Sequence, residues 1–473
     1  MKKALCFVLI LILIFSAAGC VKNDGRSRLY LIYMNGSDLE TNYAAASKDL
    51  AEIMSANISA ETRIIVQTGG TEKWHNENIN PEFNQRFELK DNSMEKIWEG
   101  KAENMGKAST LSDFIVWGAE NYRADEYYLI LWNHGGGAIS GFGKDETFES
   151  DTLLISELNN ALSAANEKCG IIFNMIAFDA CLMASIECLA AVKDYCEYVV
   201  ASQELVPVTG FEYKSFFNTQ ARFDAQGGRV AKNLAEIYFN EEMKKSSVNY
   251  LTVSVISTQA LDNLMEAFRS STEEIKAYLN KDDYTIAQGL NATMSFGGKS
   301  EAEGYSNMVD LLSFAENFAP DSYEQLYEYV NEAVIYKRNG LQQKNACGIS
   351  VYYPKYATEN LVSEAMLYAS SGFCPEYADV VKEYTENLTQ ENIAVLDKTL
   401  KSKNTMLFKG SGADYELIAT SLFNDYYVVT NVDEPNIFYR VEISKINNKV
   451  KVLCKCFGVK TSVGLTEQKY IPE

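Results

Sequence analysis

The stretch of residues 127–187 constrains the fold of this chain most strongly. It holds two short apolar runs, each broken abruptly by small and polar residues: YYLILW (127–132) stops at NHGGG, and IIFNMIAF (171–178) stops at DAC. Unbroken apolar runs of this length are typical of strands that are buried on both faces of a parallel sheet. Active sites in open α/β sheets lie beyond the carboxyl ends of such strands. We therefore expect His134 and Cys181 at the same edge of one sheet.

Histidine is scarce in this chain, which limits where a catalytic base can lie. The only two among 473 residues are His75, in a polar run typical of an exposed loop, and His134. A His that follows a strand is often a turn residue bonded to backbone. Here the three glycines at 135–137 favour a site instead, because they let backbone and a substrate approach closely.

Four segments resemble the clostripain-type cysteine peptidases, which belong to the wider caspase-like group. In the order of that family they are YLIYMNGSDLE (30–40), WNHGGG (132–137), FDACLMASIE (178–187) and GISVYYP (348–354). The resemblance covers roughly residues 29–385. Cys181 also follows His134 by 47 positions, near the interval of roughly 50 in caspases. The resemblance implies a caspase-like fold and a peptidase with a Cys-His dyad that needs no third acid.

The residues around Cys181 suit a nucleophile. The segment that follows it has apolar residues at helical spacing, which would put Cys181 near a helix N-terminus, where the dipole stabilises a thiolate. A thiolate attacks a peptide carbonyl well, and His134 can protonate the departing amine. The backbone N–H groups of Gly135 and Cys181 are the expected oxyanion donors.

Two acids at the same edge are candidates for substrate recognition. Asp179 points to the same side as Cys181 in an extended chain, or alternatively caps the following helix. The resemblance implies that an acid at this place helps select Arg or Lys before the cut bond. Glu204, after the predicted strand 198–202, is a weaker candidate for the far wall of that pocket, since a Glu at a strand end is usually solvated. Either cation can pair with a carboxylate, so the sequence does not rank Arg against Lys.

One lysine is a candidate processing site. Lys144 lies in a glycine-rich, acidic segment between the two apolar runs. The resemblance implies that a basic residue after the catalytic His can be cut by the enzyme itself, which makes Lys144 a candidate self-cleavage site. An ordinary surface lysine is the alternative.

The order of the predicted elements indicates a doubly wound α/β fold. Strands and helices alternate in the first half, which is typical of a mostly parallel sheet flanked by helices. We predict a caspase-like peptidase domain at 29–387 and a small C-terminal β domain at 388–473. The predicted strands are 30–34, 63–67, 127–132, 171–178, 198–202, 250–256, 348–353, 415–420, 426–432, 438–446 and 449–457. The predicted helices are 109–122, 156–166, 228–245, 258–280, 305–318, 322–337 and 360–387, and 71–105 is expected to hold a small hairpin plus loop.

The N-terminus resembles a bacterial lipoprotein signal. Lys2 and Lys3 precede an apolar run that is too short for a comfortable membrane span, and SAAGC ends at Cys20. Residues 1–19 are then a signal peptide, Cys20 carries the lipid, and 20–28 is a linker. An ordinary secretory peptide or an uncut anchor is the alternative. Each reading puts the protein outside the cytoplasm, lipid-anchored to the bacterial cell membrane or secreted.

The charge balance excludes some partners. Without Lys2 and Lys3 the chain has 41 basic and 64 acidic residues, so its net charge is 41 − 64 = −23. That charge opposes binding to nucleic acid, and it leaves the N-terminal lipid as the expected membrane attachment. Protein or peptide substrates with Arg or Lys at the cut site would be attracted. Two histidines and no Cys-x-x-Cys pair give no zinc pattern, and the cysteine spacing shows no disulfide framework.

These observations lead to one expected function and two alternatives. We expect a cysteine endopeptidase that cuts after Arg or Lys and requires no cofactor. A calcium requirement stays open, since calcium supports some relatives, although no calcium-loop motif is visible. One alternative is a catalytically silent binding module of the same fold, which the intact nucleophile, base and glycines disfavour. The other is a solute-binding lipoprotein, which would need a second α/β lobe.

Overall fold

A nine-stranded sheet lies at the centre of the region that carries the predicted site. The structure, a computed structural model, describes residues 25–220, 227–245, 249–279, 289–290, 292–297, 306–354 and 361–385, with further strands between 405 and 459. The strands of the central sheet are β1 (Arg28–Asn35), β2 (Thr62–Gly69), β3 (Phe83–Lys90), β4 (Ser93–Lys101), β5 (Glu126–Trp132), β8 (Met175–Asp179), β9 (Tyr198–Ala201), β10 (Thr252–Ser257) and β13 (Val334–Asn339). Their spatial order is β13-β10-β9-β8-β5-β1-β2-β3-β4.

This sheet is doubly wound, with its switch point between β1 and β5. The inner strands β9, β8, β5, β1 and β2 are parallel neighbours. The strands β10 and β13 at one end and β3 and β4 at the other pair antiparallel. From β1 the chain continues to β2 on one side and later to β5, β8 and β9 on the other. The predicted doubly wound, mostly parallel α/β fold is therefore confirmed.

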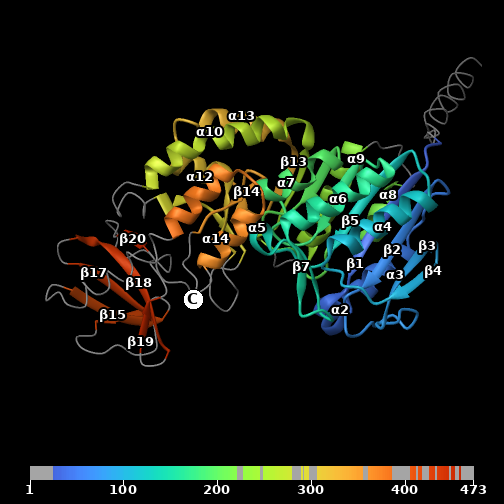
Figure 1. Ribbon diagram of the computed structural model, residues 1–473, viewed down its shortest axis with the longest axis horizontal. Helices are drawn as coiled ribbons and strands as arrows, with labels where there is room; N and C mark the ends of the chain where they lie inside the picture. Colours follow the sequence, from blue (N-terminus) through green and yellow to red (C-terminus); the bar gives the residue numbers. More distant parts are fainter. Residues whose placement is uncertain are drawn as a thin grey trace, which may run out of the picture.

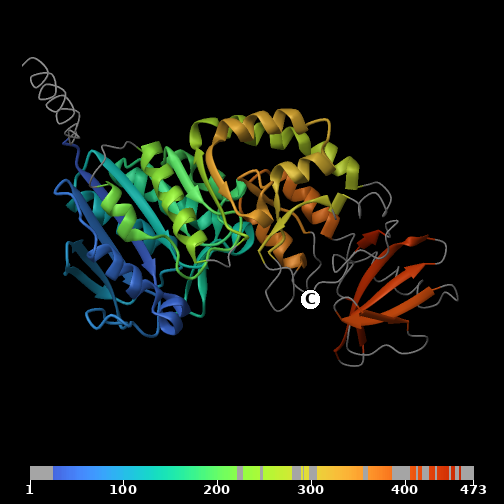
Figure 2. The same cartoon turned by 180° about the vertical axis from the view of Figure 1, so that it is seen from behind.

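Helices cover both faces of the sheet because its inner strands are apolar on both sides. In β1, Leu31 and Tyr33 join one buried cluster, whereas Ile32 and Met34 join the other. The first layer holds α4 (Ala108–Asn121), α6 (Ile155–Cys169) and α7 (Ile186–Val192), and the second holds α3 (Ala45–Met54), α8 (Tyr213–Gln220) and α9 (Gly227–Lys244). Figures 1 and 2 show helices along both sides of the sheet. Burial on both faces explains the unbroken apolar runs in the sequence.

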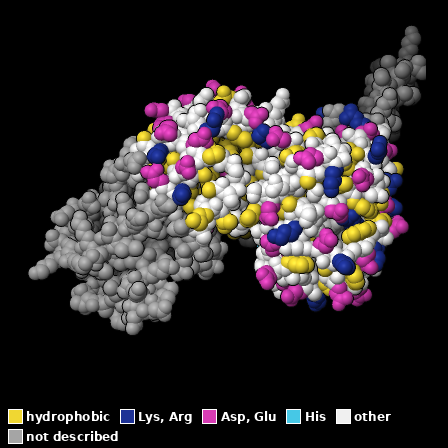
Figure 3. Space-filling model, in the orientation of Figure 1, with side chains coloured by type: hydrophobic (Ala, Val, Ile, Leu, Met, Phe, Trp, Pro, Cys, Tyr) yellow, Lys and Arg dark blue, Asp and Glu magenta, His cyan; other side chains and the backbone are white. Residues whose placement is uncertain are grey.

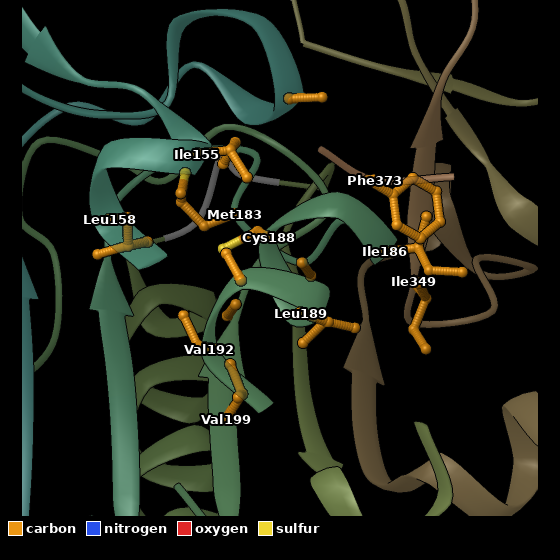
Figure 4. Close-up of a cluster of buried hydrophobic side chains, with 14 of the residues drawn as sticks. Ile155, Leu158, Met183, Ile186, Cys188, Leu189, Val192, Val199, Ile349 and Phe373 are labelled. Atoms are coloured by element: carbon orange, nitrogen blue, oxygen red, sulfur yellow. The ribbon is translucent and has the colours of Figure 1, made fainter. Parts of the chain in front are cut away.

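A helical region with a small antiparallel sheet adjoins α7. It comprises α10 (Leu261–Leu279), α12 (Leu311–Phe318), α13 (Tyr323–Ala333), α14 (Leu361–Ser370), β11 (Ser295–Phe296), β12 (Met308–Asp310) and β14 (Ser350–Tyr352), and residues 375–385 are also helical. Figure 4 shows the shared core, where Ile186 of α7 lies beside Ile349 and Phe373. This packing joins the helix after the candidate nucleophile to the second region.

Two predicted helices are partly wrong. The predicted helix 305–318 becomes helical only at Leu311, because β12 pairs between β11 and β14. The predicted helix 322–337 ends at Ala333, and the next residues form β13, which pairs with β10 at the sheet edge. Pairing with strands far away in the chain overrides a local helical pattern. The hairpin expected within 71–105 is confirmed as β3 and β4.

Shorter elements complete the described chain. They are α2 (Ser37–Tyr43), α5 (Gly137–Ser140), β6 (Phe142–Asp145), β7 (Asp151–Leu153), η1 (Lys193–Tyr195), η2 (Thr258–Ala260) and η3 (Leu341–Gln343). Within the described residues, no helix has the length and apolar character needed to cross a bilayer. Residues 1–24, with Cys20, and 386–404, where the predicted domain boundary falls, lie outside the described residues.

The C-terminal strands form an antiparallel sheet of their own, as predicted. Its strands are β15 (Thr405–Ser411), β16 (Asp414–Leu417), β17 (Tyr426–Asn431), β18 (Glu434–Ile446), β19 (Lys449–Val452) and β20 (Phe457–Val459). Their order is β16-β15-β17-β18-β19, and β20 also pairs with β18. Strand β15 was not predicted from the sequence. The predicted turn at 447–448 lies outside the described residues.

Candidate active site

The ends of β5 and β8 bring His134 and Cys181 to one edge of the sheet. The two strands are parallel neighbours in register, with Trp132 opposite Asp179, and each candidate residue follows its strand by two positions. Gly135 then packs against the backbone of Cys181. A Cβ atom at Gly135 would lie 2.0 Å from the carbonyl oxygen of Cys181, so a larger residue does not fit without moving the chain.

The chain after Cys181 overturns one expectation. Cys181 lies in a turn, and α7 begins only at Ile186, so the predicted helix N-terminus at the thiol is wrong. Leu182 adopts a left-handed backbone (φ 63°), which is strained for a residue with a side chain. The N–H of Ala184 then donates to the carbonyl of Ser202 at 2.9 Å. These residues bond to the chain beyond β9 before the helix starts, so the N-terminus of α7 does not lie at the sulfur.

The thiol of Cys181 is partly buried and bonded to the backbone. The N–H of Val206 donates to the sulfur at 3.2 Å, and the thiol reaches the carbonyl of Val206 at 3.7 Å. Burial raises the pKa of the Cys181 thiol, and the carboxylates of Glu204 and Asp179 add to this, whereas the N–H groups of Val206 and Gly135 oppose it. This raised pKa favours the neutral thiol, so a nucleophilic role for Cys181 would require a base that takes its proton.

The imidazole of His134 pairs with a carboxylate that the sequence analysis did not assign to the site. Its Nε2 lies 3.0 Å from Oδ1 of Asp38, three residues past β1, and Nζ of Lys144 lies 3.5 Å from the same oxygen. Burial raises the pKa of Asp38, but the hydrogen bond and charge of His134, together with Lys144, outweigh it, so the pKa is lowered. Among the described residues, no hydrogen bond joins His134 to Cys181.

Asp179, the last residue of β8, is enclosed by the loop before α8 and by the first residue of that helix. Its two oxygens accept the N–H of Phe211 at 3.1 and 3.0 Å, and one accepts the hydroxyl of Tyr213 at 2.8 Å. The pKa of Asp179 is raised to about 7, chiefly by burial; the charges of Glu242 and Glu52 also raise it, and the hydrogen bonds from Phe211 and Tyr213 oppose them. The alternative that Asp179 caps the following helix is wrong, because its carboxylate anchors the loop that leads into α8.

Glu204 is buried rather than solvated. One of its oxygens accepts the N–H of Leu205 at 2.9 Å and the N–H of Gly297 at 2.7 Å, and the other accepts the amide of Gln343 at 2.7 Å. These partners come from three segments: the loop after β9, the residue after β11, and η3. Tertiary contacts that the sequence does not reveal thus hold the carboxylate close to Cys181.

Lys144 lies in β6, beside His134. The N–H of Gly143 donates to the carbonyl of His134 at 2.9 Å, and the side-chain amide of Asn133 donates to the carbonyl of Lys144 at 3.2 Å. Strand β6 also pairs with β7. A cut after Lys144 therefore requires this pair of strands to open.

The described residues offer no converging set of metal ligands. No group of three or more His, Cys, Asp or Glu side chains among them can hold a metal ion. His75 is exposed, as expected, and its Nε2 lies 3.1 Å from the carbonyl of Thr41. The cysteines within the described part of the chain are free: Cys169, Cys181, Cys188, Cys196, Cys347 and Cys374.

Two comparisons at the level of sequence agree on a family. The model of the clostripain family (Peptidase_C11) matches residues 32–406. The curated protein "Clostripain" from Hathewaya histolytica is 33% identical over 324 residues, which are 54% of this chain and 59% of that protein. The chain thus spans 59% of the length of the curated relative that it matches.

Solved structures share the fold. A secreted C11 cysteine protease from Bacteroides thetaiotaomicron, in complex with an irreversible peptide inhibitor, matches with a TM-score of 0.58 and 20% identity over 75% of this chain and 98% of its own. An inactive zymogen C11 protease from Parabacteroides distasonis matches with a TM-score of 0.57 and 20% identity over 74% of this chain and 98% of its own. At this identity the likeness shows the fold alone. Since the family model covers most of its length, the chain belongs to the clostripain family.

Proposed function

We propose that this protein is a cysteine endopeptidase that hydrolyses peptide bonds after Arg or Lys. In this proposal Cys181 is the nucleophile, and His134 is the general base and then the general acid. The observation that carries it is the meeting of His134, Gly135 and Cys181 beyond the carboxyl ends of β5 and β8. Membership of the clostripain family supports the same chemistry.

The reaction proceeds through a covalent thioester. His134 takes the proton of Cys181, and the sulfur attacks the substrate carbonyl carbon once the substrate has displaced the Val206 N–H. The N–H groups of Gly135 and Cys181 donate to the developing oxyanion. His134 then gives the proton to the departing amine. Water attacks the thioester, His134 accepts a proton from it, and the acid product leaves as the thiol re-forms.

Selection of a basic residue is assigned to Asp179, with Glu204 as the weaker candidate. Asp179 lies two residues before the proposed nucleophile. The carboxylate of Glu242 lies near enough for its negative charge to raise the pKa of Asp179. The hydroxyl of Tyr238 is buried near Asp179, Glu242 and Cys181. It has no hydrogen-bond partner within the described residues. A guanidinium or ammonium group brought among these side chains would gain charge-assisted hydrogen bonds.

The proposal extends to location and processing. The lipoprotein-like sequence of residues 1–20 supports an anchor on the outer face of a bacterial membrane, through lipid on Cys20. Lys144 remains the candidate for self-cleavage, which would give a fragment that starts at Asp145 in the active protein and not in Cys181→Ala. No step uses a cofactor. If a chelator abolished hydrolysis and added calcium restored it, the enzyme would require calcium.

The experiment that tests the function compares short fluorogenic peptides that end in Arg, Lys, Asp or Asn. Purified 21–473 is measured beside Cys181→Ala and Asp179→Asn. We expect hydrolysis after Arg or Lys, none in Cys181→Ala, and in Asp179→Asn a loss of about 10- to 100-fold in kcat/KM, as for one charged hydrogen bond. Hydrolysis after Asp or Asn would overturn Asp179 as the selector. Silence on every peptide, also after trypsin treatment, would favour the binding module.

A further inference from the structure

The switch point of the sheet brings an acid beside the proposed base. Strands β1 and β5 are parallel neighbours in register, with Met34 opposite Trp132. Asp38 follows β1 and His134 follows β5, so the two side chains emerge at the same sheet edge although they lie 96 positions apart. Ligands of doubly wound sheets bind at such switch points, where the chain leaves neighbouring strands in opposite directions.

Backbone contacts hold Asp38 in place before any substrate arrives. The N–H groups of Gly36 and Ser37 donate to the carbonyls of Gly69 and Gly70, both at 2.9 Å, which ties the start of α2 to the end of β2. Asp38 is then in the first turn of α2. The ends of two neighbouring strands, β1 and β2, therefore fix the backbone that carries the Asp38 carboxylate.

The contact between Asp38 and His134 occupies one particular ring nitrogen. Oδ1 of Asp38 lies 3.0 Å from Nε2, and about a third of each side chain is exposed: 33% for Asp38 and 39% for His134. A carboxylate that accepts the Nε2–H fixes the imidazole as the tautomer whose Nδ1 carries the lone pair. Nδ1 is then the nitrogen that remains for a second partner.

We propose that Asp38 is a positioning residue for His134, which holds the proton on Nε2 and leaves Nδ1 to take the proton of Cys181. This inference rests on the proposed peptidase function, in which His134 is the base. Once the thiol proton has moved, Asp38 also stabilises the resulting imidazolium, because a carboxylate next to a cation favours the charged form. The protein then works with three groups where the family resemblance implies two.

Lys144 limits this effect in the intact chain. Its ammonium lies 3.5 Å from the same Oδ1, so it offsets part of the negative charge that Asp38 offers to the imidazolium. Removal of the ammonium should therefore strengthen the pairing of Asp38 with His134. A purely structural role of Asp38 would give no such opposite response, which makes Lys144 a useful partner variant.

The test measures Cys181 directly as well as through catalysis. The protein 21–473 is compared with its Asp38→Asn, Asp38→Glu, Lys144→Gln and Glu146→Gln variants. Glu146→Gln is the matched control. The carboxylate of Glu146 accepts the hydroxyl of Thr41 in α2 at 2.6 Å, so this substitution removes the same charge from the same neighbourhood. Alkylation of Cys181 by iodoacetamide is followed by peptide mass spectrometry across pH, and kcat and KM are measured on an Arg peptide.

We expect Asp38→Asn to lower kcat at least about 10-fold with KM nearly unchanged, because the imidazole loses the carboxylate that orients it and stabilises its charged form. The pH midpoint of Cys181 alkylation should move up in Asp38→Asn and down in Lys144→Gln. Asp38→Glu should restore part of the activity, and Glu146→Gln should change neither readout.

Two results would overturn the positioning role. One is an unchanged alkylation midpoint and kcat in Asp38→Asn. The other is an equal loss in Asp38→Asn and Glu146→Gln, which would assign the effect to the folding of α2. A protein that hydrolyses no peptide, but whose Cys181 alkylation still depends on Asp38 in the expected direction, would remove the proposed function and keep the positioning role.

Discussion

Gly135 is the residue on which the proposed oxyanion geometry depends most directly. We expect Gly135→Ala to lower kcat about 100-fold, the usual loss when one oxyanion donor is displaced. The reason is that the added Cβ would lie 2.0 Å from the carbonyl oxygen of Cys181 and must push the two chains apart. Steady-state kinetics on an Arg peptide measure the effect.

The control for this change is Gly170→Ala. A Cβ at Gly170 meets no atom within 4 Å, and this residue lies at the C-terminal end of α6, away from the site. Gly170→Ala should keep kcat while it loses some stability, because Gly170 has a left-handed backbone (φ 65°). Equal kcat losses in both variants would contradict a role for Gly135 at the nucleophile.

Asp179 gives the site a dependence on pH. Burial raises its pKa to about 7, so below neutral pH the carboxyl is mostly protonated and cannot pair with a cationic side chain. We expect kcat/KM on Arg peptides to rise as pH increases through about 7, and this rise should be absent in Asp179→Asn.

The same raised pKa of Asp179 should lower the free energy of unfolding as pH rises from about 4 to 7, since the unfolded carboxyl ionises near 3.9.

Single residues also show how far sequence reasoning reaches at the site. The positions of His134 and Cys181 follow from the ends of two apolar runs, because strand ends are local features. Asp38 was missed as a partner of His134, although its place after the first strand was the available signal. The burial of Glu204 depends on Gly297 and Gln343, and no local pattern connects residues so far apart.

At the scale of elements, α7 shows why a helix start is hard to predict. The apolar pattern after Cys181 is helical, but Leu182 and Ala184 first bond to the chain beyond β9, and the helix begins after Ser185. The hydroxyl of Ser185 accepts the N–H of Cys188 at 3.2 Å as its N-cap. The cap therefore marks the true start, and the periodicity alone does not.

This cap predicts a measurable stability effect. Ser185→Ala should reduce the free energy of unfolding by about 1 kcal/mol, since the N–H of Cys188 loses its acceptor in a buried place. Urea unfolding followed by circular dichroism measures the change. Ser163→Ala, in the interior of α6, is the matched control and should change stability by only a few tenths of a kcal/mol. A Ser185→Ala variant as stable as the control would argue against the cap.

At the scale of the whole molecule, topology and charge act together. The alternation of strands and helices in the sequence predicted a doubly wound, mostly parallel sheet. The observed strand order has its switch between β1 and β5, and the candidate site lies at the carboxyl edge there. Strand β13 at the edge of the central sheet and strand β12 in the middle of the three-stranded sheet were not predictable, because they pair with β10 and β14, which lie far away in the chain. Acidic residues exceed basic ones, and on the face in Figure 3 Lys and Arg are scattered among Asp and Glu. Such a charge attracts cationic peptides and disfavours nucleic acid.

The central claim is that Cys181 is the nucleophile of a peptidase that recognises basic residues. The most direct measurement is mass spectrometry of 21–473 after incubation with a peptidyl chloromethyl ketone that ends in Arg, followed by digestion to locate the adduct. The account predicts one equivalent of label, on the peptide that contains Cys181, and far slower labelling by the matching reagent that ends in Asp. Label on another cysteine, or equal labelling by both reagents, would contradict it.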